Sequence, residues 1–172
     1  MIESRTPLPE IAAISDEHTM LQQFLEYFRT VMLRKVEGLD DQQARVTVAA
    51  SSIDMLGLVR HLADVERWWF RAVFTQEVTD AIYEADDDVD ADWHHAPTDT
   101  LVEAMQHWHN EVAWARQIVA ANTDVNAIAS LVTERRGQIS LRWIMVHMIE
   151  EYARHCGHAD LIREAIDGTV AD

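Results

Sequence analysis

The chain has 172 residues, of which 48% are hydrophobic and 26% charged, and its 30 acidic against 14 basic side chains give a formal net charge of −16. This length is enough to bury a hydrophobic core and predicts a single domain over residues 1–172. The excess negative charge would be repelled by a phosphate backbone, so we exclude nucleic acid as a partner.

Cysteine content and hydropathy predict a cytoplasmic protein. The single cysteine, Cys156, cannot form an intramolecular disulfide, so nothing indicates an oxidising compartment. Apolar runs are too short to span a bilayer, so no membrane partner is expected. The first ten residues, MIESRTPLPE, lack the basic-then-apolar pattern of a signal peptide.

Four amphipathic segments are predicted to be helical, because apolar residues recur in each at steps of three and four. Their approximate bounds are 15–37, 53–74, 98–121 and 140–166. Candidate N-caps of the first three are Ser15 or Asp16, Ser51 or Ser52, and Thr100. Helices of this length with long connecting loops predict an all-α four-helix bundle with at least one crossover.

The connection between the second and third predicted helices is strongly acidic. From Glu77 to Asp92 it carries eight acidic and no basic side chains, and Trp93, His94 and His95 follow directly. It is interpreted either as a solvated loop that only adds solubility or as a cover over the mouth of a pocket. A cover with this charge would disfavour anionic substrates and attract metal cations.

The last predicted helix carries the strongest functional signal, HMIEEYARHCGH, from His147 to His158. At about 100° per residue, Glu151, His155 and His158 all lie within about 80° of His147, so the four share one face. The apolar residues that flank this face indicate that it points at the bundle axis. Ionisable groups in a core are costly unless they are paired or bind a metal.

This face has two interpretations, a hydrogen-bonded network or a chelating site for one metal ion. A metal needs a further ligand from another helix, and His61, in LVRHLADVE, is the natural candidate. A lone histidine on an apolar face can equally be a core residue with its hydrogen bonds satisfied. His107 and His109 are predicted to lie at a solvated rim, and His18 is predicted to be exposed.

Other catalytic patterns are missing from the chain. It has no HExxH, no Walker motif and no GxSxG, and it lacks the paired Glu-x-x-His elements of di-iron bundles. Cys156 points about 100° away from His155 around the helix. It is therefore interpreted as a buried or unreactive thiol rather than a nucleophile.

The segments LVRHLADVERWWF and HMIEEYARHCGHADLIREAIDG resemble the DinB-like (YfiT-like) metalloenzyme superfamily, most closely an actinobacterial branch related to mycothiol-dependent enzymes. The resemblance covers about 18–168 and implies an up-down-down-up bundle that is often a homodimer. It also implies a divalent metal on three side chains, here His61, Glu151 and His155. The superfamily commonly has His where this chain has Glu151, a departure that resembles the His, Glu and His set of mycothiol-dependent maleylpyruvate isomerase.

The mixed nitrogen and oxygen donors favour Zn²⁺ or Ni²⁺ as the metal. The resemblance implies a small thiol such as mycothiol as co-substrate. Candidates for orienting the ligands or lining the pocket are His147, His158, Asp64 and Glu150. The expected function is metal-dependent activation of a thiol, in an S-transferase or an isomerase. A metal-dependent hydrolase and a non-catalytic bundle that binds a metal or small ligand are the alternatives.

Overall fold

A computed structural model describes residues 5–48, 51–77, 80–83, 85, 88 and 90–170. Its long helices are α1 (Glu17–Val36), α2 (Met55–Glu66), α3 (Leu101–Ala121) and α4 (Leu141–Asp167). α2 continues directly into a π-helical segment, η2 (Arg67–Phe74). A short 3₁₀ turn, η1 (Gln43–Arg45), lies between α1 and α2. The described residues form no strand, so the predicted all-α four-helix bundle is confirmed. Among them, no helix is long and apolar enough to cross a membrane.

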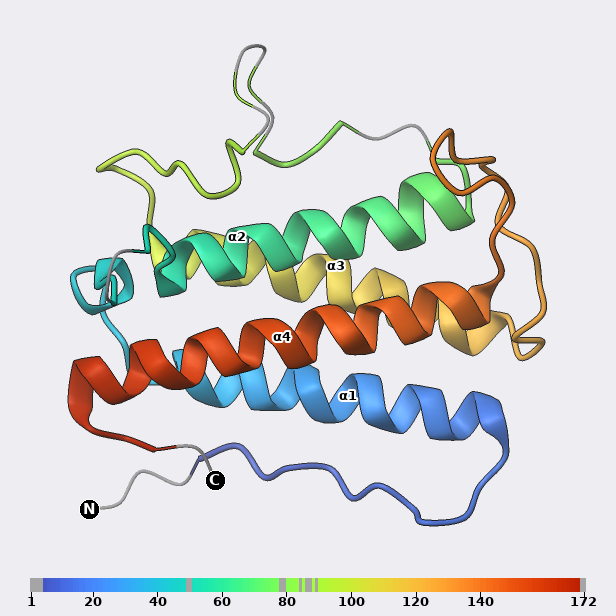
Figure 1. Ribbon diagram of the computed structural model, residues 1–172, viewed down its shortest axis with the longest axis horizontal. Coiled ribbons are helices and arrows are strands. Elements are labelled where there is room, and N and C mark those ends of the chain that lie inside the picture. The colour runs from blue at the N-terminus through green and yellow to red at the C-terminus, as the bar shows by residue number, and fades with distance from the viewer. Residues whose placement is uncertain are drawn as a thin grey trace.

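The helices have the up-down-down-up arrangement implied by the resemblance (Figure 1). α1 and α4 run in one direction and pack on each other, and α2 and α3 run in the opposite direction and pack on each other. Because α2 and α3 are parallel, the segment that joins them must return along the whole length of α2 and η2. Its described residues lie alongside α2 (Figure 1), and we call the segment 75–100 the crossover.

Side-chain caps begin all four helices. Asp16, Thr100 and Ser140 cap α1, α3 and α4. For α2, the prediction that Ser51 or Ser52 is the cap was wrong. Asp54 caps this helix, because its Oδ1 accepts a hydrogen bond from the backbone N–H of Gly57 at 2.8 Å. The other carboxylate oxygen lies 2.7 Å from His95 Nε2, so the cap also fastens the end of the crossover.

The apolar faces of the four helices meet in one core. Its largest fully buried side chains include Phe70, Leu25, Met32, Leu58, Leu62, Ile144 and Met148. One expectation about burial was wrong. His18, expected to be exposed, is half-buried, because its Nε2 lies 3.0 Å from the carbonyl oxygen of Val119.

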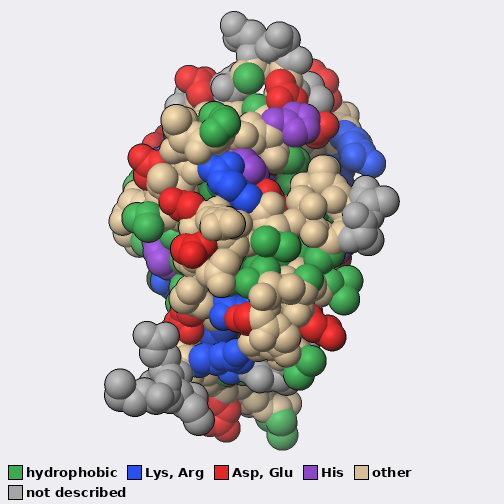
Figure 2. Space-filling view, turned by 90° about the vertical axis from the view of Figure 1, so that its left-hand side faces the viewer, with side chains coloured by type: hydrophobic (Ala, Val, Ile, Leu, Met, Phe, Trp, Pro, Cys, Tyr) green, Lys and Arg blue, Asp and Glu red, His purple; other side chains and the backbone are tan. Residues whose placement is uncertain are grey.

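The net charge of −16 does not form one acidic patch on the end of the bundle where α2 and α3 begin. Acidic and basic side chains are interspersed there, with apolar side chains between them (Figure 2). The charges that bear on a ligand are therefore the local ones around its pocket.

Candidate metal centre

Two helices bring the three predicted metal ligands together. His61 lies near the middle of α2, and Glu151 and His155 lie one turn apart on α4. The Oε1 atom of Glu151 is 3.1 Å from His61 Nε2 and 3.1 Å from His155 Nε2. One ligand atom from each of the three side chains lies within 4.8 Å of the others. The three side chains are therefore close enough to contact a single ion.

The crossover completes the surroundings of His61. Asp92 Oδ2 lies 2.6 Å from His61 Nδ1. The ring of Trp93 stacks on the imidazole, with 4.5 Å between ring centroids and 28° between planes, and lies 5.7 Å from the ring of His155. When His61 gives up its second proton, a proton kept on Nδ1 and donated to Asp92 would leave the Nε2 lone pair available to a metal ion beside Glu151. This is how a carboxylate orients a histidine that binds a metal.

The electrostatics of the cluster favour a positive charge between His61 and Glu151. Burial opposes protonation of His61, but its hydrogen bonds to Asp92 and Glu151 outweigh burial and raise the pKa of His61 to about 9. Hydrogen bonds from His155 and His61 hold the pKa of Glu151 well below its usual range. Glu151 is therefore an ionised carboxylate near neutral pH, which is the form that a metal ion binds.

His147 and Glu150 lie at the edge of this cluster. His147 stacks on Trp143, with 5.1 Å between centroids, and its Nδ1 is 3.5 Å from Glu150 Oε2. With Glu151 these two side chains form a second group of ligand atoms within 4.8 Å of one another. The guanidinium of Arg154, however, pairs with both glutamates. The arginine thus offsets part of the negative charge that a second cation at His147 would need.

His158 and Asp64 have different positions. His158 Nδ1 lies 3.3 Å from His155 Nδ1, so His158 is placed to orient the ring of that ligand. The carboxylate of Asp64 instead accepts hydrogen bonds from the backbone N–H groups of Ile82 and Tyr83, at 2.6 and 3.3 Å. Asp64 therefore fastens the crossover to α2.

A pocket of about 600 Å³ opens beside His61 between α2 and the crossover. Its lining includes His61 and Asp64 from α2, Trp68 from η2, and Tyr83, Asp88 and Asp92 from the crossover. Glu84, Asp86 and Asp87 of the acidic segment lie outside the described residues. The volume falls in the range of small-molecule sites, and the described part of the acidic segment forms one wall of it.

The other histidines are held elsewhere. His94 pairs with Asp88 and His95 with Asp54, each at 2.7 Å, while His107 lies 3.0 Å from the Tyr83 hydroxyl and His109 is exposed. Cys156 is only 4% exposed, and its Sγ faces the carbonyl oxygen of Phe28 at 3.6 Å. Burial raises the pKa of the Cys156 thiol to about 12, which agrees with the expectation of an unreactive thiol.

Asp92 and Trp93 were not among the predicted site residues. Asp92 is the last of eight acids in an acidic run, so its sequence surroundings do not distinguish it from residues that only carry surface charge. The one available signal is its position directly before Trp93, where the acidic run ends in an aromatic residue.

Comparison with known families gives one match. A family model described as Mycothiol-S-transferase matches residues 20–168, a range that includes α2, α3, α4 and nearly all of α1. His61, Glu151 and His155 all lie within the matched range. No curated protein matches the chain.

Proposed function

The chain belongs to the mycothiol S-transferase family within the DinB-like superfamily, and we propose that it is a metal-dependent enzyme that activates a small thiol of the mycothiol type. The reaction is the transfer of a group to the thiol sulfur, or an isomerisation that uses the same thiol. In this proposal one divalent ion, Zn²⁺ or Ni²⁺, is held by His61, Glu151 and His155.

The observation that carries the proposal is the convergence of two imidazole nitrogens on one carboxylate oxygen, each at 3.1 Å. Two nitrogens and one oxygen from three side chains form a donor set found at catalytic zinc sites, which keep a further position open. Imidazole and carboxylate together also suit Ni²⁺. The donor set present in this chain therefore fits a divalent ion.

When bound in such a site, a divalent ion lowers the pKa of a coordinated thiol, so that the reactive thiolate forms near neutral pH. The residues around the ligands prepare the site for it. Asp92 keeps the proton of His61 on Nδ1, and Trp93 covers one face of the His61 ring and keeps water from it.

The pocket beside His61 supports an enzyme over a bundle that only stores a metal. Its volume of about 600 Å³ leaves room for a small molecule next to His61, one of the three proposed ligands. A purely structural network of His61, Glu151 and His155 would need no such space. The non-catalytic bundle stays the alternative if no activity accompanies metal binding.

Metal analysis of protein purified without an affinity tag tests the site. We expect one divalent ion per chain in the wild type and loss of that ion in the His61→Ala/His155→Ala double variant. His109→Ala, which removes an exposed histidine on α3, is the matched control and should keep the metal. An unchanged metal content in the double variant would rule the site out.

Conjugation of monochlorobimane tests the reaction. The metal-loaded protein is incubated with the dye and with mycothiol, bacillithiol or glutathione in turn. Metal-dependent conjugation with one of these thiols supports an S-transferase. Cleavage of esters or amides without any thiol would instead support the hydrolase alternative.

Three further properties stay predictions. The resemblance implies a homodimer, the chain length predicts a single domain, and the composition predicts a cytoplasmic protein. Sedimentation equilibrium measures the first, limited proteolysis the second and cell fractionation the third.

A further inference from the structure

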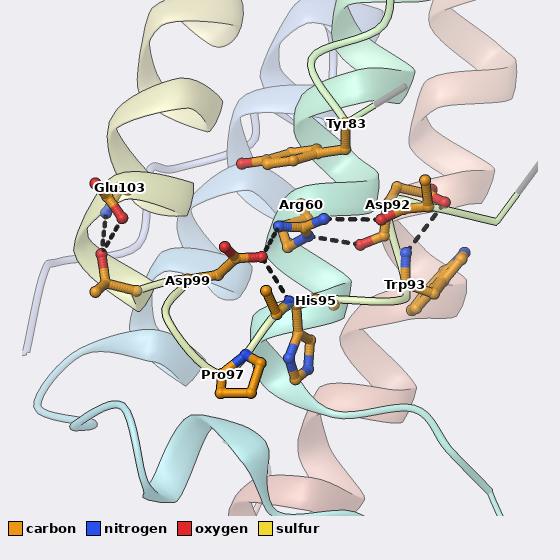
Figure 3. Close-up of polar contacts among 12 residues, drawn as sticks. Arg60, Tyr83, Asp92, Trp93, His95, Pro97, Asp99 and Glu103 are labelled. Atoms are coloured by element: carbon orange, nitrogen blue, oxygen red, sulfur yellow. Dashed lines mark hydrogen bonds and ion pairs between the residues drawn. The ribbon is translucent and has the colours of Figure 1, made fainter. Parts of the chain in front are cut away.

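The side chain of Arg60, the residue directly before His61 on α2, binds backbone carbonyl groups of the crossover (Figure 3). Its Nε donates to the carbonyl oxygen of Asp92 at 2.9 Å, and its Nη2 donates to that of Ala91 at 2.7 Å. Its Nη1 pairs with Asp99 Oδ2 at 2.6 Å, and its guanidinium lies over the ring of Tyr83 at 3.8 Å. Arg60 is only 7% exposed, so these contacts are shielded from water.

The same short stretch of backbone carries Asp92 and Trp93, the two crossover residues that contact His61. Arg60 fixes the carbonyl oxygen of Asp92, whose side chain meets His61 Nδ1. Trp93 follows and lies directly against α2 at Gly57, where an added Cβ would come within 3.2 Å of Trp93 Cε3. The glycine thus leaves the room that this close approach needs, and Arg60 supplies the attachment.

We infer that Arg60 is a positioning residue for His61, which it orients through Asp92 and Trp93. The inference rests on the proposed function, because the purpose of the arrangement is to present His61 Nε2 to a metal ion. A loop of this length would otherwise sample many conformations at a large entropic cost. Two hydrogen bonds from Arg60 to the successive carbonyl groups of Ala91 and Asp92 restrict the backbone conformation at the residues that contact His61.

The chemistry requires arginine at this position. Three acceptors in different directions are served by three separate nitrogens of one planar group. A lysine ammonium is a single point that cannot reach all three acceptors in this geometry. Arg45 holds the next part of the crossover, through His95 Nδ1 at 2.6 Å and the carbonyl oxygen of Ala96 at 3.1 Å, but not Asp92 or Trp93 themselves.

Arg60→Met tests the inference, with Arg71→Met as the matched control. Arg71 also lies on the second helix, over an aromatic ring (Trp114, 4.2 Å) and paired with an acid (Glu111, 2.7 Å), but it does not hold the crossover near His61. Zn²⁺ affinity is measured by competition with a chromophoric chelator. We expect Arg60→Met to weaken Zn²⁺ binding by about tenfold or more, as when other residues that orient a ligand are lost, and Arg71→Met to leave it unchanged.

A second readout needs no metal. The emission of Trp93 is isolated by subtracting the spectrum of the matching Trp93→Phe protein. In the metal-free protein, we expect Arg60→Met to move this emission to longer wavelength, because Trp93 loses its place against Gly57 and His61. If the wild type bound no Zn²⁺, the proposed function would fail, yet this spectrum would still decide whether Arg60 holds Trp93.

A double-variant cycle separates positioning from general destabilisation. If Arg60 acts through Asp92 as well as Trp93, the losses of Zn²⁺ affinity in Arg60→Met and Asp92→Asn should combine to less than their product in the Arg60→Met/Asp92→Asn protein. Should Arg60→Met not fold, Arg60→Lys keeps the charge without the planar group, and the same loss is expected in a smaller amount. Wild-type Zn²⁺ affinity and Trp93 emission in the Arg60 variant, or multiplicative effects of Arg60→Met and Asp92→Asn, would overturn the inference.

Discussion

Arg29 on α1 binds both carboxylate oxygens of Glu66 on α2, with Nε–Oε1 at 2.8 Å and Nη2–Oε2 at 2.7 Å. Both side chains are buried. The hydroxyl of Tyr152 on α4 donates to Glu66 Oε1 at 2.7 Å, and the indole N–H of Trp108 on α3 donates to that hydroxyl at 2.7 Å. One polar network therefore links all four helices through the core.

Removing the negative charge of the buried Arg29–Glu66 pair should lower the free energy of unfolding. Glu66→Gln leaves Arg29 buried with Glu26, at 2.6 Å, as its remaining charged partner among the described residues, and we expect a loss of about 3 kcal/mol in the free energy of unfolding. Glu17→Gln, which breaks an exposed pair with Arg142, should cost much less, because water and salt screen that pair. Urea denaturation measures both, and equal losses would show that the buried pair has no special role.

This network also marks the limit of what the sequence could predict about the fold. The helices were predictable because apolar spacing is a local signal, and so were the caps at Asp16 and Thr100. A buried ion pair between Arg29 and Glu66, 37 residues apart, has no local signature. Both residues look like surface charges on amphipathic helices until the bundle is assembled.

The candidate site likewise contains residues that the sequence could place together and residues that it could not. Glu151 and His155 could be paired from the sequence, because residues four apart share a helix face. Asp92, Trp93 and Arg60 could not be, because they meet only where the crossover returns along α2. That return follows from the parallel direction of α2 and α3, which no segment of the sequence specifies by itself.

Glu151 and its neighbour Glu150 should respond very differently to the loss of charge. Glu151→Gln removes the carboxylate that both His61 and His155 contact, so we expect its Zn²⁺ affinity to fall by more than about tenfold. Glu150→Gln breaks only the exposed contacts with Arg154 and His147 and should bind Zn²⁺ almost as the wild type does. Chelator competition compares them, and an equal loss in both would argue for a site centred on His147.

Cys156 should take no part in thiol chemistry. The thiol is 4% exposed and faces the backbone of α1, so Ellman's reagent should label it slowly in the folded protein and quickly once urea unfolds the chain. Cys156→Ala should keep both Zn²⁺ affinity and thiol-transfer activity. A loss of activity with unchanged Zn²⁺ affinity would mean that Cys156 does contribute to the reaction.

Tyr83 should make the protein less stable in strong alkali. Burial raises the pKa of Tyr83 from its ordinary value of 10.0 to about 12, against the opposing effect of Arg60. Between these two pH values the unfolded chain loses the phenol proton before the folded chain does, so the free energy of unfolding falls as pH rises. Tyr83→Phe removes the titrating hydroxyl, so the free energy of unfolding of this variant should fall less than that of the wild type between pH 10 and 11.5. Parallel curves for the two proteins in denaturant titrations would contradict this assignment.

If the proposed thiol transfer takes place, the charge around the pocket should make the protein discriminate between electrophiles of similar shape. Asp80 and Asp88 line the pocket from the crossover, and Arg67, the basic residue among the described lining, is already paired with Glu111 at 3.0 Å. Iodoacetamide and iodoacetate differ mainly in one negative charge, so their rates of thiol alkylation, each divided by the uncatalysed rate, measure the discrimination. We expect the neutral reagent to be preferred.

The preference should depend on these charges and on salt. Two charges about 8 Å from a reagent contribute at most about 1 kcal/mol in water, which is about fivefold in rate, and the pairing of Asp88 with His94 lowers this figure. The Asp80→Asn/Asp88→Asn protein should therefore lose up to about fivefold of the preference, and so should the wild type as salt is raised, because these charges are screened over about 8 Å at physiological ionic strength. Neither residue is a proposed ligand, so the double variant should keep the Zn²⁺ content of the wild type. An unchanged preference in the double variant at low salt would mean that the crossover carries its acidic side chains without influencing what enters the pocket.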